Sequence, residues 1–167
     1  DRDGYLDILI SGKSNNGSIT QLYQNKGGLG FDPISLGFMP MTDSRLAWGD
    51  FNNDGFSDIL LAGENSGTPI TKIYLNNGDS TFIDLLLNLP GIQGGSVAWG
   101  DYNDDGFLDI LLSGKSGPND GDRLTVLFRN INGVGFEEDV INSPVLTDLD
   151  VGNKAIWGDY DKDGKLT

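Results

Sequence analysis

The strongest constraint on the fold of this chain is an internal repeat. The sequence Leu-Ala-Trp-Gly-Asp at residues 46–50 recurs as Val-Ala-Trp-Gly-Asp at 97–101 and as Ala-Ile-Trp-Gly-Asp at 155–159. The copies start 51 and then 58 residues apart. A repeat of about 50 residues is typical of architectures in which each small unit buries its apolar faces against its neighbours.

Each repeat consists of short apolar or alternating stretches separated by clusters of Gly, Asn, Asp and Ser. Such stretches are typical of strands joined by turns, and no segment has the periodicity of a helix. Each of the first two Trp-Gly-Asp copies is followed by a predicted strand, at 58–63 and 109–114, and residues 7–12 match these two. Later strands of the repeats are predicted at 19–23, 70–75 and 124–128, and around Phe31, Phe82 and Phe136. Four antiparallel strands in about 50 residues predict an all-β fold made of β-propeller blades.

The composition limits the partners and the chemistry of the chain. Among 167 residues, 11 Lys and Arg stand against 25 Asp and Glu, a net charge of −14 that disfavours nucleic acid and anionic membranes. There is no Cys and no His, so thiolate, imidazole and Cys/His zinc chemistry are excluded. No apolar run approaches the roughly 20 residues of a membrane helix, so membrane insertion is not expected. Hard, oxygen-bound cations are the expected metal partners.

Two Asx-rich loops, at residues 50–58 and 101–109, carry oxygen side chains at loop positions 1, 3, 5 and 9. Gly55 and Gly106 at position 6 permit a sharp turn at positive φ, and the position 7 carbonyl adds a ligand. Six or seven oxygens suit Ca²⁺ better than Mg²⁺. The predicted metal ligands are Asp50, Asn52, Asp54, Phe56 and Asp58 in one loop, and Asp101, Asn103, Asp105, Phe107 and Asp109 in the other.

Two other interpretations match part of the loop pattern. An EF-hand has a bidentate acid at position 12, where this chain has Leu61 and Leu112, so that interpretation fails. An Asx-rich hairpin turn without metal is the remaining alternative. It is disfavoured because three carboxylates within nine residues would repel one another without a cation.

Partial copies of the loop occur near both ends of the sequence. Asp1, Asp3, Tyr5 and Asp7 fit positions 3, 5, 7 and 9 of one further loop. Positions 1, 3, 5 and 7 of another are Asp159, Asp161, Asp163 and Lys165. In that last loop position 9 is Thr167, where an acid is expected, so the site is predicted to be weaker.

These strands and loops predict about three repeats of an incomplete propeller. Residues 1–42 form a partial blade with the last three strands, 43–93 a complete blade with a calcium loop, 94–152 a complete blade with a calcium loop and an insertion, and 153–167 the first strand and loop of a further blade. Closed propellers have at least four blades. The ring is therefore expected to be completed by the remainder of a longer chain or by head-to-tail self-association.

The segment from Ala47 to Leu61 and its repeats resemble the FG-GAP or VCBS repeat family, the blades of integrin α-subunits and of many bacterial surface proteins. Ala62-Gly63-Glu64 stands where the Gly-Ala-Pro element would be, which favours the bacterial type. The resemblance spans essentially the whole chain. It implies structural calcium in loops between the first two strands of each blade, at one face, and a location outside the cell or at its surface.

The predicted function is a calcium-stabilised extracellular module for adhesion or for recognition of protein or glycan at a cell surface. No catalytic residue and no cofactor other than Ca²⁺ is predicted, because nearly every clustered carboxylate belongs to a loop. Two alternatives stay open: the propeller domain of a secreted polysaccharide-acting lyase or hydrolase, and a passive structural spacer in a larger surface protein.

Aromatic residues and one insertion complete the predictions. Trp48, Trp99 and Trp157 are expected to pack between blades rather than stack on sugars. The aromatic residues at loop position 2, Phe51, Tyr102 and Tyr160, leave an alternative open, because this side chain can lie on the loop surface and contact a ligand. The insertion at 116–123 is a solvated hairpin tip or a recognition surface.

Overall fold

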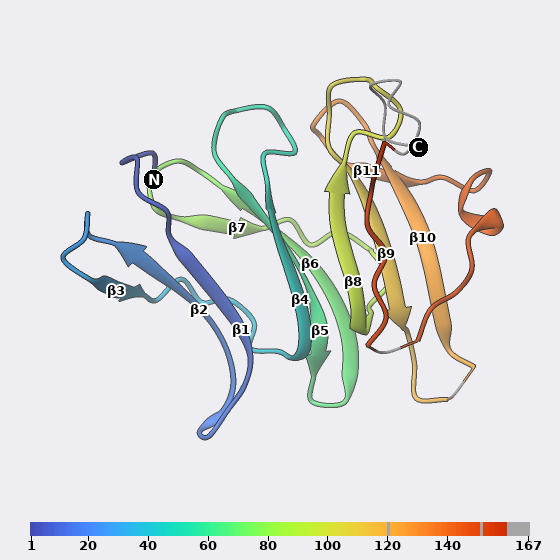
Figure 1. Cartoon of the computed structure of the whole chain (residues 1–167), viewed down its shortest axis with the longest axis horizontal. Coiled ribbons are helices and arrows are strands. Elements are labelled where there is room, and N and C mark those ends of the chain that lie inside the picture. Colours follow the sequence, from blue (N-terminus) through green and yellow to red (C-terminus); the bar gives the residue numbers. More distant parts are fainter. Residues whose placement is uncertain (120, 151, 160–167) are drawn as a thin grey trace.

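Three antiparallel β-sheets lie side by side in the computed structural model, which describes residues 1–119, 121–150 and 152–159 (Figure 1). The described residues contain no α-helix, only a short 3-10 helix at Ser143–Val145 (η1). The prediction of an all-β fold of incomplete propeller blades is confirmed. No helix of the described residues is long and apolar enough to cross a membrane.

The sheets follow the sequence order, as consecutive blades do. Their strand orders are β1-β2-β3, β4-β5-β6-β7 and β8-β9-β10-β11, with antiparallel neighbours throughout. The strands are β1 (Ile8–Ser14), β2 (Gly17–Asn25), β3 (Phe31–Ile34), β4 (Thr42–Gly49), β5 (Asp58–Asn65), β6 (Thr68–Asn76), β7 (Phe82–Asp84), β8 (Gln93–Gly100), β9 (Asp109–Lys115), β10 (Arg123–Asn130) and β11 (Phe136–Glu138). Strand β4 lies against β8 on one side and against β1 on the other.

The middle sheet is covered on both faces, which explains the continuous apolar run of β5. Successive side chains of a strand point to opposite faces of its sheet. Ile59 and Leu61 therefore join a core shared with Leu9 of the first sheet. Leu60, between them, joins a second core that includes Ile110 of the third sheet. All three β5 residues are at most 1% exposed, so both faces of this blade are interior.

The first strands of the two four-stranded sheets contain the same irregularity. The register shifts between Thr42 and Arg45 in β4 and between Gln93 and Ser96 in β8, as expected for a β-bulge. The Arg45 guanidinium crosses to the next sheet, where its Nε donates to the carbonyl of Gly95 at 2.7 Å. Neighbouring blades are thus joined by polar contacts as well as by apolar cores.

Aromatic rings fill the interface between the second and third sheets. Trp99 stacks on Phe51, with ring centroids 6.0 Å apart and planes 9° apart, and both rings contact Phe136. Phe51 is 2% exposed, so the alternative that this position 2 ring lies on the loop surface is wrong here. The packing role predicted for Trp99 is confirmed, and Trp157 stacks on Tyr102 in the same way.

The insertion in the third repeat lies in the hairpin between β9 and β10, at the end of the sheet away from the Asx-rich loops (Figure 1). Its base is closed by the amide of Ser116, which donates to the carbonyl of Asp122 at 2.7 Å. A local bond follows at the tip, where the Asn119 amide donates to the Asp122 carboxylate at 2.8 Å. The described part of this segment is therefore an ordered hairpin end.

Candidate metal centre

The Asx-rich loops lie together at one edge of the molecule. Residues 50–57 connect β4 to β5 and residues 101–108 connect β8 to β9, while residues 1–7 lead into β1. In Figure 1 all three segments lie at the upper edge, opposite the β1–β2, β5–β6 and β9–β10 hairpins. The repeat therefore places equivalent loops beside one another.

Two positions of each loop have left-handed backbone conformation. Position 6 is Gly55 at φ 84° and Gly106 at φ 88°, which confirms the predicted sharp turn. Position 4 is also left-handed, with Asn53 at 58° and Asp104 at 60°. Such a conformation is unusual for residues with a side chain, although Asn and Asp adopt it more readily than most. This second left-handed position was not predicted from the sequence.

Backbone amides of the 50–58 loop point at its own side-chain oxygens. The Asp50 carboxylate accepts from the amides of Asp54, at 3.0 Å, and Gly55, at 2.7 Å. The Asn52 oxygen also accepts from the Asp54 amide, at 3.2 Å. The Asp54 carboxylate accepts from the Phe56 amide at 2.7 Å and from the Asn52 side-chain amide at 2.9 Å. Positions 1, 3 and 5 are thus held around one tight turn.

The 101–109 loop repeats this pattern bond for bond. The Asp101 carboxylate accepts from the amides of Asp105, at 3.0 Å, and Gly106, at 2.8 Å. The Asp105 carboxylate accepts from the Phe107 amide at 2.9 Å and from the Asn103 side-chain amide at 2.9 Å. The two loops, which share their Asx-Gly spacing, therefore adopt the same conformation.

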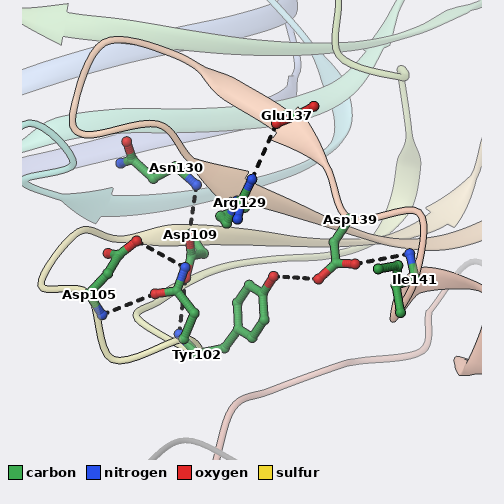
Figure 2. Close-up of polar contacts among 9 residues, drawn as sticks. Tyr102, Asp105, Asp109, Arg129, Asn130, Glu137, Asp139 and Ile141 are labelled. Atoms are coloured by element: carbon green, nitrogen blue, oxygen red, sulfur yellow. Dashed lines mark hydrogen bonds and ion pairs between the residues drawn. The ribbon is translucent and has the colours of Figure 1, made fainter.

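The position 9 carboxylate is buried at the base of each loop. Asp58 is fully buried, and its two oxygens accept from the amides of Phe51, at 3.1 Å, and Asn76, at 2.9 Å. In the third sheet, Asp109 accepts likewise from Tyr102, at 3.1 Å, and Asn130, at 2.7 Å (Figure 2). Each carboxylate oxygen keeps a second lone pair, so these bonds leave capacity for another partner.

Burial shifts the acidity of this position. Loss of water around Asp58 raises the pKa of its carboxyl to about 6, although the amides of Asn76 and Phe51 lower it and the Asp54 and Asp50 carboxylates raise it further. The pKa of the Asp109 carboxyl is likewise raised to about 6, first by burial. Burial is thus the main cause of both raised pKa values, and the neighbouring loop carboxylates add to it.

An asparagine at the end of the second strand of each sheet supports position 9. Asn25, Asn76 and Asn130 each donate their backbone amide to the position 9 aspartate of their own sheet, at 2.7–2.9 Å. Their side-chain amides donate to the carbonyl of position 8, at 2.9–3.1 Å. Their part in the loop was not predicted. Their recurrence at a fixed strand end was the signal in the sequence.

The loop at the start of the sequence has the same local bonds. The Asp3 amide donates to Asp1 at 3.1 Å, and the Tyr5 amide donates to Asp3 at 2.9 Å. Asp7 accepts from the Asn25 amide at 2.9 Å. The structure therefore brings the predicted residues 1, 3, 5 and 7 into the conformation of the other loops.

The predictions for the last loop are only partly within the described residues. Asp159, at position 1, is partly buried. The other predicted ligands, Asp161, Asp163 and Lys165, lie outside the described residues, as does Tyr160.

The donor set of each complete loop suits a hard cation. All side-chain donors are oxygens, and the ion pairs that join described residues all involve other acidic side chains. The side-chain oxygens do not converge on one point as the sequence predicts. Among the described residues, no three carboxylates are placed so that they could hold one metal ion. In the 50–58 loop, the carboxylates of positions 1, 5 and 9 all face backbone amides. Ligand type and charge therefore fit Ca²⁺, and the side chains of positions 1, 5 and 9 would have to turn toward it.

A second polar cluster lies beside the 101–109 loop. The Tyr102 hydroxyl donates to Asp139 at 2.5 Å, and Asp139 also accepts from the amide of Ile141 (Figure 2). The Asn142 amide donates to the same carboxylate. The hydroxyl bond, followed by those from Asn142, lowers the pKa of the Asp139 carboxyl to about 2. Burial raises the pKa of Tyr102 above its ordinary value. This cluster fixes position 2 of the loop to the segment that follows β11.

A groove of about 490 Å³ lies between the first and second sheets, with Trp48 and Phe82 in its wall. Trp48 is 38% exposed, and its ring centroid lies 6.4 Å from that of Phe82. Trp99, which occurs at the Trp48 position of the next repeat, is stacked on Phe51. The groove beside Trp48 therefore lies at the place that corresponds to the ring of Phe51 in the interface between the second and third sheets.

Comparisons with known proteins agree with the repeat. The FG-GAP-like repeat family matches residues 1–61 and 50–112. Cartilage acidic protein 1 of Xenopus tropicalis is 31% identical over an alignment of 143 residues, which covers 78% of this chain and 20% of that protein. The Homo sapiens protein of the same name is 31% identical over an alignment of 114 residues, which covers 66% of this chain and 16% of that protein. The chain thus spans a fifth or less of the length of these relatives. No solved structure gives a significant match.

Proposed function

Since this chain belongs to the FG-GAP-like repeat family, we propose that it is a calcium-stabilised part of an extracellular β-propeller that presents a surface for binding protein or glycan. The observation that carries the proposal is the repeated loop. In two neighbouring blades the same oxygen side chains are held by the same backbone bonds around a turn at Gly55 or Gly106. Their carboxylates have no basic side chain among the ion pairs of the described residues.

The residues that would hold the ion are the side chains of positions 1, 3, 5 and 9, with the position 7 carbonyl. When bound, Ca²⁺ supplies positive charge that offsets the repulsion between these carboxylates. Extracellular sites of this kind bind with dissociation constants of about 0.1 to 1 mM. At millimolar calcium, each site would therefore stabilise the fold by about 1 kcal/mol. In cytosol such sites would be largely empty, which supports a location outside the cell.

A binding role is supported more strongly than catalysis. The raised pKa of Asp58 and Asp109 is a property that general acids share. Both carboxylates, however, are fully buried and engaged by backbone amides, so a substrate could not reach them. The related proteins are named for acidic character and for cartilage, and this chain has a net charge of −14. We therefore propose a non-enzymatic module, with the ligand bound by surfaces away from the loop bases.

We also propose that the groove beside Trp48 is filled when the propeller ring is completed. The groove is apolar on the side of Leu22 and Phe82, and β1 is an edge strand of its sheet. A strand bearing an aromatic residue at loop position 2 would fit there as Phe51 fits against Trp99. It would come from the remainder of a longer chain or from a second copy. Sedimentation at increasing concentration distinguishes these sources, because only the second predicts self-association.

Thermal unfolding across a calcium titration tests the metal proposal. Calcium is expected to raise the melting temperature, and Asp54→Ala or Asp105→Ala is expected to reduce that gain. Glu138→Ala, which removes an exposed acid from β11, is the matched control for loss of charge. The metal proposal fails if both loop variants keep the full calcium-dependent gain. Binding to arrays of glycans and matrix proteins, with and without chelator, tests the recognition proposal, which fails if nothing binds.

A further inference from the structure

A side chain from one Asx-rich loop bonds directly to the turn of the next loop. The Asn53 side-chain amide donates through Nδ2 to the carbonyl of Gly106 at 2.8 Å. Asn53 is position 4 of its loop and Gly106 is position 6 of the following one. The bond therefore joins two candidate metal loops that are 53 residues apart in the sequence.

The preceding pair of loops is joined in the same way by a different residue. Arg2, which also corresponds to position 4, donates through Nε to the Gly55 carbonyl at 2.8 Å and through Nη2 to the Asp54 carbonyl at 2.9 Å. Its guanidinium lies over the Phe56 ring, 3.9 Å from the centroid. Two unrelated side chains thus make the same connection, so the connection follows from the loop geometry and not from one residue type.

Position 4 is well placed to report the state of its own loop. Its neighbours along the chain, Asn52 and Asp54, are positions 3 and 5, both predicted ligands. Its left-handed backbone, at φ 58° for Asn53, is a conformation that the bonds of the loop must maintain. Calcium bound to the ligands on either side of Asn53 would keep its backbone in this conformation. The Asn53 side-chain amide would then stay bonded to the Gly106 carbonyl of the next loop.

We propose that position 4 couples neighbouring loops, so that calcium binding at 50–58 increases the calcium affinity of 101–109. The inference rests on the proposed calcium function. Linkage requires the effect to be reciprocal: occupation of 101–109 strengthens binding at 50–58 by the same factor. One hydrogen bond contributes about 1 kcal/mol, so we expect a coupling of about three- to tenfold in affinity.

The test follows each loop separately by NMR during a calcium titration. The amides of Gly55 and Gly106 donate to Asp50 and Asp101, so each signal follows the side-chain oxygens of its own loop. Asp54→Ala disables the first loop, and we expect it to weaken binding at the second loop by about three- to tenfold. The reciprocal variant Asp105→Ala should weaken binding at the first loop by the same factor.

Asn53→Gly removes the connecting amide and keeps a residue that tolerates positive φ. In this variant, Asp54→Ala should no longer weaken binding at the second loop. Ser66→Gly is the matched control, since Ser66 has φ 52°, is exposed, and lies in the β5–β6 hairpin of the same blade. With Ser66→Gly the coupling should remain.

The outcomes separate the two proposals. If the amide signals of Gly55 and Gly106 in the unsubstituted protein do not shift with calcium, the proposed calcium function is wrong. If both loops bind calcium and the coupling persists in Asn53→Gly, or if Asp54→Ala leaves the second loop unchanged, only the coupling is wrong. A merely structural role for Asn53 would lower stability without changing how one loop depends on the other.

Discussion

The backbone amide of Asn130 donates to Oδ1 of Asp109 at 2.7 Å. The side chain of the same residue donates to the carbonyl of Leu108, at 2.9 Å, and to that of Phe51 in the neighbouring blade, at 2.8 Å. Asn130 is 2% exposed. One buried asparagine thus fixes the base of its own loop and joins it to the loop of the preceding blade.

Asn130→Ala should be strongly destabilising. The substitution leaves two carbonyl oxygens without the buried donor that they share, so we expect a loss of about 2–3 kcal/mol in the free energy of unfolding. Urea denaturation measures it. Asn25→Ala is the control, because Asn25 is less buried and its side chain donates to the Leu6 carbonyl. Equal losses in the two variants would contradict the inter-blade role of Asn130.

Trp99→Ala and Trp48→Ala test the aromatic interface at equivalent positions of two blades. Trp99 stacks on Phe51 and contacts Phe136, so truncation should cost about 3–5 kcal/mol. Trp48 borders the groove and is 38% exposed, so its loss should be about half as large. Chemical denaturation of both variants provides the comparison, and a larger loss for Trp48 would show that the groove is filled in solution.

Tyr102→Phe should lower stability in a pH-dependent way. The Tyr102 hydroxyl holds the pKa of Asp139 at about 2, below its ordinary value, so the bond stabilises the fold above about pH 4. This contribution is lost as the pH falls through about 2. We expect Tyr102→Phe to lower the free energy of unfolding by about 1 kcal/mol between pH 5 and 9, a figure that allows for the partial solvent exposure of the bond. The difference from the unmodified chain should shrink toward pH 2.

The comparison for Tyr102→Phe is Tyr74→Phe. The Tyr74 hydroxyl accepts from the Met39 amide at 3.0 Å, a partner that does not titrate. Its replacement should lower stability without the acid dependence. Urea unfolding from pH 2 to 9 gives the profiles, and parallel profiles for the two variants would rule out a bond to ionised Asp139.

Glycine replacements should distinguish a left-handed turn from a close approach of two backbones. At Gly106 an added methyl group would meet no atom within 4 Å. Gly106→Ala should therefore lower the free energy of unfolding only by the strain of alanine at positive φ, about 1–2 kcal/mol. At Gly95 the methyl group would lie 1.8 Å from the Ser113 carbonyl oxygen, so Gly95→Ala must shift β8 or β9. We expect it to be the more damaging change in thermal denaturation. A smaller loss at Gly95 would mean that the bulge in β8 adjusts freely.

Much of the local structure could be predicted from the sequence, because it depends on residues close together in the chain. The order of strands follows from apolar runs punctuated by Gly and Asx clusters. The turn at Gly55 and the bonds that the Asp50 carboxylate accepts from the amides of Asp54 and Gly55 arise within a single loop. The glycine at position 6 is enough to predict that turn, because a residue with no Cβ adopts positive φ without a steric penalty.

The hydrogen bonds between blades could not be predicted, because the bonds of Asn53 and Asn130 join residues 53 and 79 positions apart. The sequence shows that Asn130 recurs at a strand end and that Asn53 lies at loop position 4, but not that Asn53 reaches Gly106 or that Asn130 reaches Phe51. It left open whether the ring of Phe51 faces solvent, and the neighbouring Trp99 decides that it is buried.

The sequence by itself determined that this chain forms antiparallel strands joined by oxygen-rich turns, since strand periodicity and turn chemistry are short-range properties. Only the tertiary structure decided which faces of each sheet became interior, and how each loop contacts the next. The physical reason is that burial and inter-loop hydrogen bonds depend on the distance between blades, which no local pattern specifies.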